Sequence, residues 1–384
     1  MDKVKVGVIG TGSMGSSHIN GNLVLPNVEI TAVCDIDPKA LEKFNDRPNI
    51  KQFTDPDKFF AEADVDAVVI ATPHFFHHTY AIRALDAGKH VLVEKPIAVH
   101  KNLAKQMLDA AARHPELKFS AMFNQRTIEA HKKIKELIDS GELGKIQRVN
   151  WTITNWFRSQ AYYDSGDWRA SWRGEGGGVL LNQCPHQLDL FQWFFGLPKK
   201  LRAFAYFGKY HNIEVEDEVN AFMEYENGTT AIFTASTAEA PGTNRLEIAC
   251  DRGRLVYENG KISFTRTTTL VSEHTATTDK RFGIPDVWNV EIPADPNGAK
   301  QHQNIFINFF DAIQKDVPLI APAVEGIRAL ELGNAMLLSA WQDATVEFPI
   351  DSDAFEAKLN ELIATSRYEK KVQVVSNEGF DKSF

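Results

Sequence analysis

A glycine-rich turn near the N-terminus constrains the fold more than any other stretch of the chain. Val4–Gly10 has the continuous apolar character of a buried strand, and it runs into Gly10-Thr11-Gly12-Ser13-Met14-Gly15 with a helix-like segment behind it. In a GxGxxG turn the first glycine permits the tight bend and the second lets a pyrophosphate approach the backbone. The third lets helix and strand pack closely. The pattern indicates a strand–turn–helix unit that binds a dinucleotide.

An acidic residue at the end of the next expected strand supports this interpretation. Ile30–Asp35 is typical of a strand, and Asp35 follows Gly15 by 20 residues. A carboxylate at that place accepts hydrogen bonds from the adenosine ribose, and its charge repels a 2′-phosphate. The residues after it, Ile36 and Asp37, are not basic. We therefore expect NAD as the cofactor, with NADP less favoured.

Strands and helices continue to alternate through the first third of the chain. Apolar runs at 66–72, 91–96 and 118–123 are separated by helical patterns at 77–87 and 102–113. This order predicts right-handed crossovers and a parallel sheet. The expected fold is α/β, with an N-terminal doubly wound Rossmann domain over residues 1–124.

The run at 91–96 ends in Glu94-Lys95-Pro96. Ligands in open α/β sheets gather at the carboxyl ends of strands, so a lysine there is a candidate for chemistry. The alternative is that Glu94 and Lys95 only cap a strand on a solvated loop. Histidines 74, 77 and 78 stand after the preceding strand, but no acid or cysteine nearby completes a tetrahedral set. We expect no metal, and interpret that segment as a loop beside the nicotinamide.

The second part of the chain begins with a loop over residues 157–174 that is dense in aromatic and arginine side chains. Aromatic rings with polar groups suit stacking on sugars. Nucleic acid would suit these residue types too, but a net charge of -9 disfavours it. Contact with a neighbouring subunit is the alternative. The candidate substrate residues are Arg126, which comes well before this loop, and Trp156, Arg158, Tyr162, Trp168 and Trp172, which lie in or beside it.

Three glycines at 176–178 precede an expected helix over residues 179–195. Asn182, His186 and Asp189 follow one another at spacings of four and three, so a continuous helix would carry them on one face. Pro185 lies inside the helix and is expected to kink it. A histidine on a core helix is usually structural, but the polar face beside a glycine-rich start favours ligand binding.

Residues from 201 to 267 show short strands with hairpin turns such as Asn227-Gly228, which predicts an antiparallel sheet. Helices return at 302–315 and 323–342, and a polar helix is expected after Pro349. We expect a second, α+β domain over 125–384 with a large open, mainly antiparallel sheet. One sheet face should meet its own helices, and the other should join a second copy in a homodimer or homotetramer.

The composition indicates in which compartment, and with which kinds of partner, the protein is expected to act. The chain is 43% hydrophobic and 24% charged, and its three cysteines form no CxxC pair. The first apolar run is too short for a signal peptide, and no run of 18 apolar residues occurs. We expect a cytoplasmic protein with neither a membrane nor a nucleic-acid partner.

Taken together, these motifs resemble the glucose–fructose oxidoreductase / inositol dehydrogenase / rhizopine-catabolism (Gfo/Idh/MocA) family. The resemblance covers nearly the whole chain. It rests on the glycine turn, Ala71-Thr72-Pro73, Glu94-Lys95-Pro96, and Gly176-Gly177-Gly178 with His186 and Asp189.

The resemblance implies an enzyme that transfers hydride between a nicotinamide and a secondary alcohol or ketone of a sugar, inositol or sugar derivative. It implies that Lys95, commonly before a cis proline in the family, is the active-site lysine and that His186 is the acid/base. Many relatives carry aspartate where this chain has Asn182, which we expect to act as a polar positioner. The cofactor contacts that we expect are Gly10, Thr11, Gly12, Ser13, Met14, Gly15, Asp35, Ile36, Ala71, Thr72, Pro73, His74, His77, Glu94, Lys95 and Asn124. Asn182 and His186 are also expected to touch substrate.

Two alternatives stay open at this point. One is a cofactor-binding sensor or transcription co-regulator with the same fold and no turnover. The retention of Lys95 and His186 and the absence of a DNA-binding appendage disfavour it. The other is a family reductase or dehydrogenase with a non-sugar substrate, such as a biliverdin-reductase-like enzyme or one that acts on unsaturated diols.

Overall fold

A computed structural model describes residues 3–295 and 300–368. The chain divides into two compact units. Unit 1 runs to Thr127 and also takes in Lys300–Glu331 and Ser352–Glu356, which a linear division at residue 124 does not anticipate. Unit 2 consists of Ile128–Ala299, Leu332–Asp351 and the chain from Ala357.

Unit 1 contains a six-stranded, all-parallel sheet in the order β3-β2-β1-β4-β5-β6, which confirms the expected Rossmann fold. Its strands are β1 (Val4–Ile9), β2 (Val28–Cys34), β3 (Lys51–Phe53), β4 (Ala67–Ile70), β5 (His90–Val93) and β6 (Phe119–Ala121). Every residue of β4 is buried, as expected of a strand covered on both faces. The short β3 was not expected, because three residues give too little pattern to recognise.

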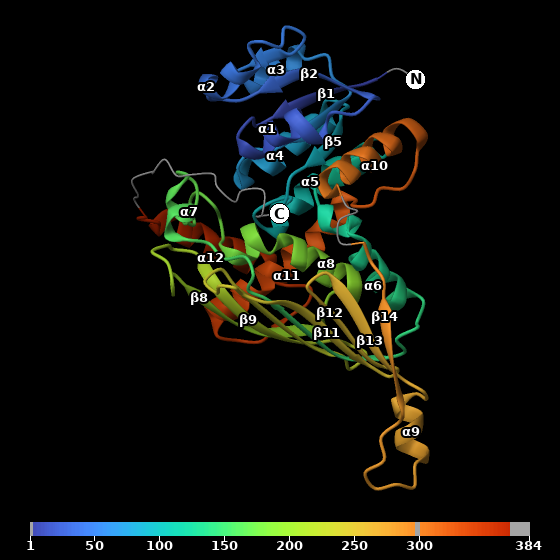
Figure 1. Ribbon diagram of the computed structural model, residues 1–384. Helices are drawn as coiled ribbons and strands as arrows, with labels where there is room; N and C mark the ends of the chain where they lie inside the picture. The colour runs from blue at the N-terminus through green and yellow to red at the C-terminus, as the bar shows by residue number, and fades with distance from the viewer. Residues whose placement is uncertain (1–2, 296–299, 369–384) are drawn as a thin grey trace. The chain divides into compact units, whose positions relative to one another are not determined.

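Helices alternate with these strands along the chain, in the blue and teal part of Figure 1, and a helix over residues 301–315, orange in the figure, also belongs to unit 1. The helix after the glycine turn is divided into a short α-helix and a π-helical turn, and α4 starts at His74, three residues earlier than expected. The helical elements of unit 1 are α1 (Ser13–Ser17), η1 (His18–Asn22), α2 (Pro38–Leu41), η2 (Glu42–Phe44), α3 (Pro56–Glu62), α4 (His74–Asp86), α5 (Lys101–Arg113), η3 (Asn124–Thr127) and α10 (Gln301–Lys315).

Unit 2 contains a nine-stranded sheet in the order β14-β13-β12-β11-β7-β10-β9-β8-β15, in which only β7 and β10 pair in parallel. The expected mainly antiparallel sheet is therefore confirmed. The strands are β7 (Ile146–Ile153), β8 (Lys200–Phe207), β9 (Glu216–Glu224), β10 (Thr230–Ser236), β11 (Asn244–Cys250), β12 (Gly253–Glu258), β13 (Lys261–Thr267), β14 (Val287–Ile292) and β15 (Val346–Glu347).

The two faces of this sheet differ. Along β7 the side chains of Val149, Trp151 and Ile153 are buried, as their alternation predicts. Figure 1 shows α6 (Glu129–Asp139) and α8 (Pro185–Phe195) along one face, and α9 (Val271–Thr277) beyond the ends of β13 and β14. The other face exposes large apolar side chains, among them Phe204 and Phe222.

The expected helix over residues 179–195 is divided in two. Val179–Gln183 forms a π-helical turn, η4, and α8 begins afresh at Pro185. Proline lacks an N–H and is accommodated best in a first helical turn, so the helix restarts there instead of kinking. Asn182 and His186 consequently do not lie on one continuous helix.

Two of the remaining helices agree with the sequence pattern. They are α11 (Ala323–Gln342), which passes from unit 1 into unit 2, and α12 (Ser352–Thr365). A short helix, α7 (Gln160–Asp164), lies within residues 157–174, which were expected to form a loop. Among the residues that the structure describes, no helix is long and apolar enough to cross a membrane.

Candidate functional site

Gly10 and Gly15 of the turn adopt the geometry that their spacing predicts. Gly10 has a φ of 88°, and a Cβ on it would lie 2.6 Å from the carbonyl oxygen of Ala71. A Cβ on Gly15 would lie 1.9 Å from the carbonyl oxygen of Gly10, which leaves no room for a side chain. Around Gly12 no neighbouring heavy atom of the described chain comes within 4 Å of such a Cβ. The backbone is therefore open where a pyrophosphate would approach.

Asp35 stands beside this turn, at the end of β2. Its Oδ2 accepts hydrogen bonds from the Thr11 backbone N–H (2.7 Å) and hydroxyl (3.0 Å), and its Oδ1 accepts from the Asp37 N–H (3.0 Å). The carboxylate has room for one further donor, which fits a ribose hydroxyl. The ammonium of Lys43 donates to the Thr11 carbonyl, so a cation also reaches this turn. Inspecting only the residues just after Asp35 in the sequence missed that lysine.

The loop after β4 is braced by His77. Its Nε2 lies 2.7 Å from the Thr72 carbonyl oxygen and its Nδ1 lies 2.7 Å from the Pro96 carbonyl oxygen. Burial lowers the pKa of His77, so a neutral ring donates to one of these carbonyls at a time. The contacts link the loop after β4 to the turn after β5. They favour a supporting role for His77, while direct contact with a cofactor stays a prediction for it and for His74.

The Glu94-Lys95-Pro96 turn follows β5, and the Lys95–Pro96 peptide bond is cis, as the family resemblance implies. The Glu94 carboxylate is buried, with Oε1 2.6 Å from Nε2 of His18 and Oε2 accepting from the Lys95 backbone N–H at 3.2 Å. Burial raises the pKa of Glu94, but the hydrogen bond from His18, with further electrostatic contributions from His18, His302 and Lys95, lowers it to about 2. Glu94 is therefore ionised, and it is not a cap on a solvated loop.

Arg126 lies at the end of unit 1 and is 1% exposed. Its guanidinium donates to the Ile320 carbonyl at 3.2 Å and forms an ion pair with Glu325 at 2.5 Å. Nearby, the Asn124 amide donates to Oε1 of Gln301 at 3.0 Å. These contacts give Arg126 a structural role that could not be predicted from the sequence. Its contact with substrate stays a prediction.

In unit 2 the tryptophans expected to bind substrate have different surroundings. Trp172 is 5% exposed and packs edge-on against Trp341, with ring centroids 5.7 Å apart, as a core residue does. Trp156 is also buried. Trp168 is half-buried, with the Arg169 guanidinium 4.3 Å from its ring centroid. Of the three, Trp168 is the best placed to contact a ligand.

Tyr162, on α7, stands at the centre of a polar cluster. Its hydroxyl oxygen lies 2.7 Å from Nη1 of Arg169, 3.2 Å from Nδ2 of Asn182 and 3.1 Å from Nε2 of Gln183. The guanidiniums of Arg158 and Arg169 lie 4.9 and 4.4 Å from its ring centroid. The cluster brings together three of the expected substrate residues, Arg158, Tyr162 and Asn182, and adds a second cation, Arg169.

Asn182 and His186 are both buried, at 8% and 6% exposure. The Asn182 amide donates to the carboxylate of Glu175, which is fully buried and also accepts from the Ala170 N–H at 2.7 Å. A carboxylate accepts hydrogen bonds only, so the amide nitrogen must face it. Many relatives carry an aspartate at the position of Asn182. In this chain a carboxylate is supplied by Glu175, seven residues earlier, which contacts the Asn182 amide.

A second buried acid holds the start of η4. The Glu216 carboxylate, on β9, accepts from the Gly178 N–H (2.9 Å) and the Leu180 N–H (3.0 Å). Burial raises the pKa of Glu216 to about 7, against the two backbone donors that lower it. Sequence reasoning missed Glu175, Glu216 and His18. For His18 a signal existed, because one helical turn after Gly15 it falls on the side that faces the sheet.

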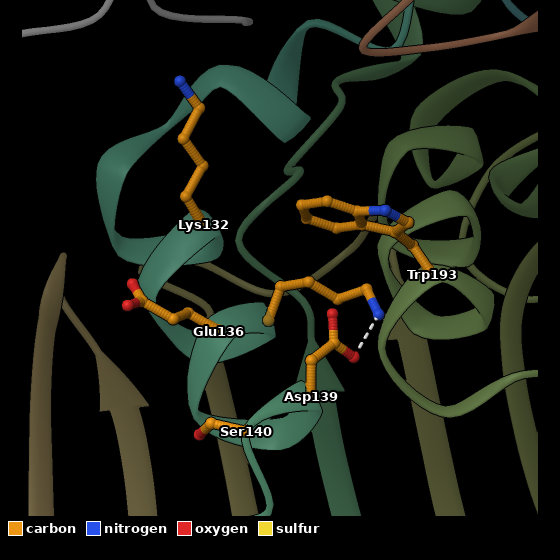
Figure 2. A pocket seen from close by; sticks show the side chains of 6 residues that line it. Lys132, Glu136, Asp139, Ser140 and Trp193 are labelled. Atoms are coloured by element: carbon orange, nitrogen blue, oxygen red, sulfur yellow. Dashed lines mark hydrogen bonds and ion pairs between the residues drawn. The ribbon is translucent and has the colours of Figure 1, made fainter. Parts of the chain in front are cut away.

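A separate hollow of about 510 Å³ lies on the surface of unit 2 (Figure 2). The Lys135 ammonium pairs with Asp139 at 2.5 Å and lies 5.8 Å from the Trp193 ring centroid. Lys132 and Glu136 extend from the same helix, α6. The hollow contains none of the expected site residues. Its lining consists of Lys132, Lys135, Glu136, Asp139, Ser140 and Trp193.

Comparison with known proteins agrees with this geometry. Residues 4–122 match the NAD-binding Rossmann fold of an oxidoreductase family, and residues 131–256 match the GFO/IDH/MocA C-terminal domain. The two matched ranges together span well over half of the chain. The first of these ranges contains the glycine turn, Asp35 and the Glu94-Lys95-Pro96 turn. The chain belongs to the GFO/IDH/MocA oxidoreductase family.

Two curated relatives illustrate the similarity. A 1-carboxy-3-chloro-3,4-dihydroxycyclohexa-1,5-diene dehydrogenase of Comamonas testosteroni is 31% identical over 61% of this chain and 58% of its own. An inositol 2-dehydrogenase/D-chiro-inositol 3-dehydrogenase of Lacticaseibacillus casei is 34% identical over 37% of this chain and 42% of its own. The chain therefore matches about half the length of these relatives.

Among solved structures, the WlbA dehydrogenase of Chromobacterium violaceum in complex with NADH and UDP-GlcNAcA has a TM-score of 0.79. It is 25% identical, and the alignment covers 91% of this chain and 97% of that one. The fold of both units is therefore that of a family dehydrogenase.

Proposed function

We propose that this protein is an NAD-dependent oxidoreductase that interconverts a secondary alcohol and a ketone on a sugar, inositol or sugar derivative. One observation carries the proposal. Lys95 follows an ionised, buried Glu94 at the carboxyl end of β5, in a parallel sheet whose β2 ends in Asp35 and whose β1 ends in the glycine turn. That edge of such a sheet binds dinucleotides.

Each of the proposed site residues would have a separate role in cofactor binding or in the reaction. The open backbone at Gly12 and the carboxylate of Asp35 would hold the cofactor, which when bound supplies the hydride acceptor or donor. His186 would take the proton of the substrate hydroxyl. Lys95 would donate a hydrogen bond to the same oxygen as negative charge develops on it. Asn182, fixed by Glu175, would position a substrate hydroxyl.

The substrate class rests on the relatives and on the cluster around Tyr162. The names of the relatives specify a dihydroxy ring compound and inositols, and WlbA was crystallised with UDP-GlcNAcA. Arg158 and Arg169 beside Tyr162 would suit a polyol that also carries an anionic group, because guanidinium binds carboxylate and phosphate in bidentate fashion.

A screen of turnover tests the proposal. Inositols, aldoses, glycosides, uronic acids, nucleotide sugars and keto-sugars would be offered with NAD and with NADP, while nicotinamide absorbance is followed. We expect turnover with a member of this panel and NAD. A protein that binds NADH tightly but turns over no member would instead support the sensor or co-regulator, and activity restricted to unsaturated diols or bilins would support the non-sugar alternative.

The choice of cofactor yields a prediction for Asp35. Asp35→Asn keeps an acceptor for the Thr11 N–H but removes the negative charge that repels a 2′-phosphate. We expect the ratio of kcat/KM for NADP to that for NAD to rise at least about tenfold, because Lys43 already brings a cation to the turn. Asp37→Asn, on an exposed neighbour, is the matched control and should leave the ratio unchanged. An unchanged ratio in Asp35→Asn would remove Asp35 from cofactor selection.

The exposed face of the nine-stranded sheet supports the expectation of a homo-oligomer. Phe204, Phe222 and Ile232, on β8, β9 and β10, are 54%, 44% and 42% exposed. A cluster of large apolar side chains on an open sheet is typical of a surface that meets another protein chain. We propose that a second copy of unit 2 covers it.

A further inference from the structure

We propose that His18 is a positioning residue of the cofactor site, which holds the Glu94 carboxylate in place and ionised, and that this carboxylate makes the site favour NAD+ over NADH. The inference rests on the proposed binding of NAD and goes beyond it, because it concerns the redox state of the cofactor that the protein prefers.

His18 opens η1 and is fully buried. Its Nε2 lies 2.6 Å from Oε1 of Glu94, and its Nδ1 lies 3.0 Å from the amide nitrogen of Asn22. The Asn22 amide donates to Nδ1, so the ring proton stands on Nε2 and is donated to the carboxylate. Both ring nitrogens are used, which fixes the plane of the ring.

Two rings of α10 cover the ring of His18. Phe306 of α10 packs edge-on against His18, with centroids 5.0 Å apart, and the ring of His302 lies 5.8 Å away. Burial lowers the pKa of His302 to about 4, so this second imidazole is neutral near pH 7. The charged or titratable groups that act on Glu94 include His18 from η1, His77 from α4, His302 from α10 and Lys95 from its own turn.

The Glu94 carboxylate also contacts the backbone that carries the proposed active-site lysine, because its second oxygen accepts a hydrogen bond from the Lys95 N–H at 3.2 Å. A buried charge acts strongly on its surroundings because the local dielectric constant is low. At the strand end that binds the dinucleotide, a carboxylate stabilises the cationic ring of NAD+ more than the uncharged ring of NADH.

Loss of His18 would leave the Glu94 carboxylate with the hydrogen bond from the Lys95 N–H but without its shortest one. Such a buried carboxylate takes up a proton at a higher pH, since burial disfavours the charged form. His18→Leu should therefore let Glu94 become protonated near neutral pH. His18→Gln places an amide that can still donate to Glu94 and should preserve the ionised form.

The experiment measures the affinities of the full-length protein for NAD+ by calorimetry and for NADH by nicotinamide fluorescence, from about pH 6 to about pH 8.5. In the wild type and His18→Gln we expect the ratio of the two dissociation constants to vary little with pH. In His18→Leu we expect NAD+ binding to weaken on the order of tenfold relative to NADH as the pH falls. Melting temperatures serve as the control for folding.

Two results would overturn the proposal. One is a ratio in His18→Leu as independent of pH as in the wild type, and the other is a folded His18→Gln that behaves like His18→Leu. If His18→Leu does not fold, Glu94→Gln decides, because it should weaken NAD+ binding relative to NADH at every pH, and a wild-type ratio would refute the inference. The measurement needs no turnover, so a protein that fails the substrate screen can still pass or fail this test.

Discussion

Lys95→Ala should lower kcat by about a hundredfold or more while NAD affinity changes by less than about threefold. The ammonium of Lys95 is proposed to stabilise charge on the substrate oxygen that develops only as the reaction proceeds. Its removal therefore costs the transition state more than the bound ground state. Steady-state kinetics with a substrate from the panel, beside a direct measurement of NAD binding, would check both quantities.

The matched control is Lys105→Ala, an exposed lysine of α5 in the same unit. It should retain full activity. Turnover of Lys95→Ala within a few-fold of the wild type would contradict the assignment. Equal losses of NAD affinity and turnover would instead show that Lys95 holds the cofactor and does not act on the substrate.

His186→Gln should lower kcat/KM by about a hundredfold, because glutamine occupies a similar volume and forms hydrogen bonds but cannot accept the proton of a substrate hydroxyl. NAD affinity should be unchanged, since the expected cofactor residues belong to unit 1 and His186 lies on α8 of unit 2. Kinetics and cofactor binding would be measured as for Lys95.

His114→Ala, at the end of α5, is the control for replacing a histidine elsewhere and should be active. If His186→Gln kept its activity on a substrate whose turnover requires Lys95, the acid/base would have to be another group. Glu175 would then be the next candidate, because it is buried against Asn182 and ionisable.

The parts of the fold that the sequence predicts are those whose signal is local. The glycine turn, the apolar run of β4 and the alternation along β7 each follow from neighbouring residues. β14 was missed because nearly all of it is exposed on both faces, so no alternation marks it. At Pro185 the sequence predicted a kink, whereas the structure ends one helix and begins another. The sequence shows that proline lacks an N–H, but it does not show whether the helix bends or restarts there.

The candidate site shows the same division. Lys95 and Asp35 belong to short motifs and were predictable. Glu94 was recognised, but its partner His18 lies 76 residues away, and Glu325, which pairs with Arg126, lies 199 residues away. Such pairs are created by the tertiary fold, and no local pattern encodes them. They change the account of Glu94 from a strand cap to an ionised, buried group.

Transfer of an isotope tests the central claim most directly. A substrate from the panel, deuterated at the carbinol carbon, would be incubated with the wild-type protein and NAD, and the reduced cofactor would be examined by NMR. The proposed function predicts deuterium at C4 of the nicotinamide, with little transfer by Lys95→Ala in the same time. If a substrate is consumed but its deuterium appears only in water, direct hydride transfer between carbinol carbon and nicotinamide is contradicted.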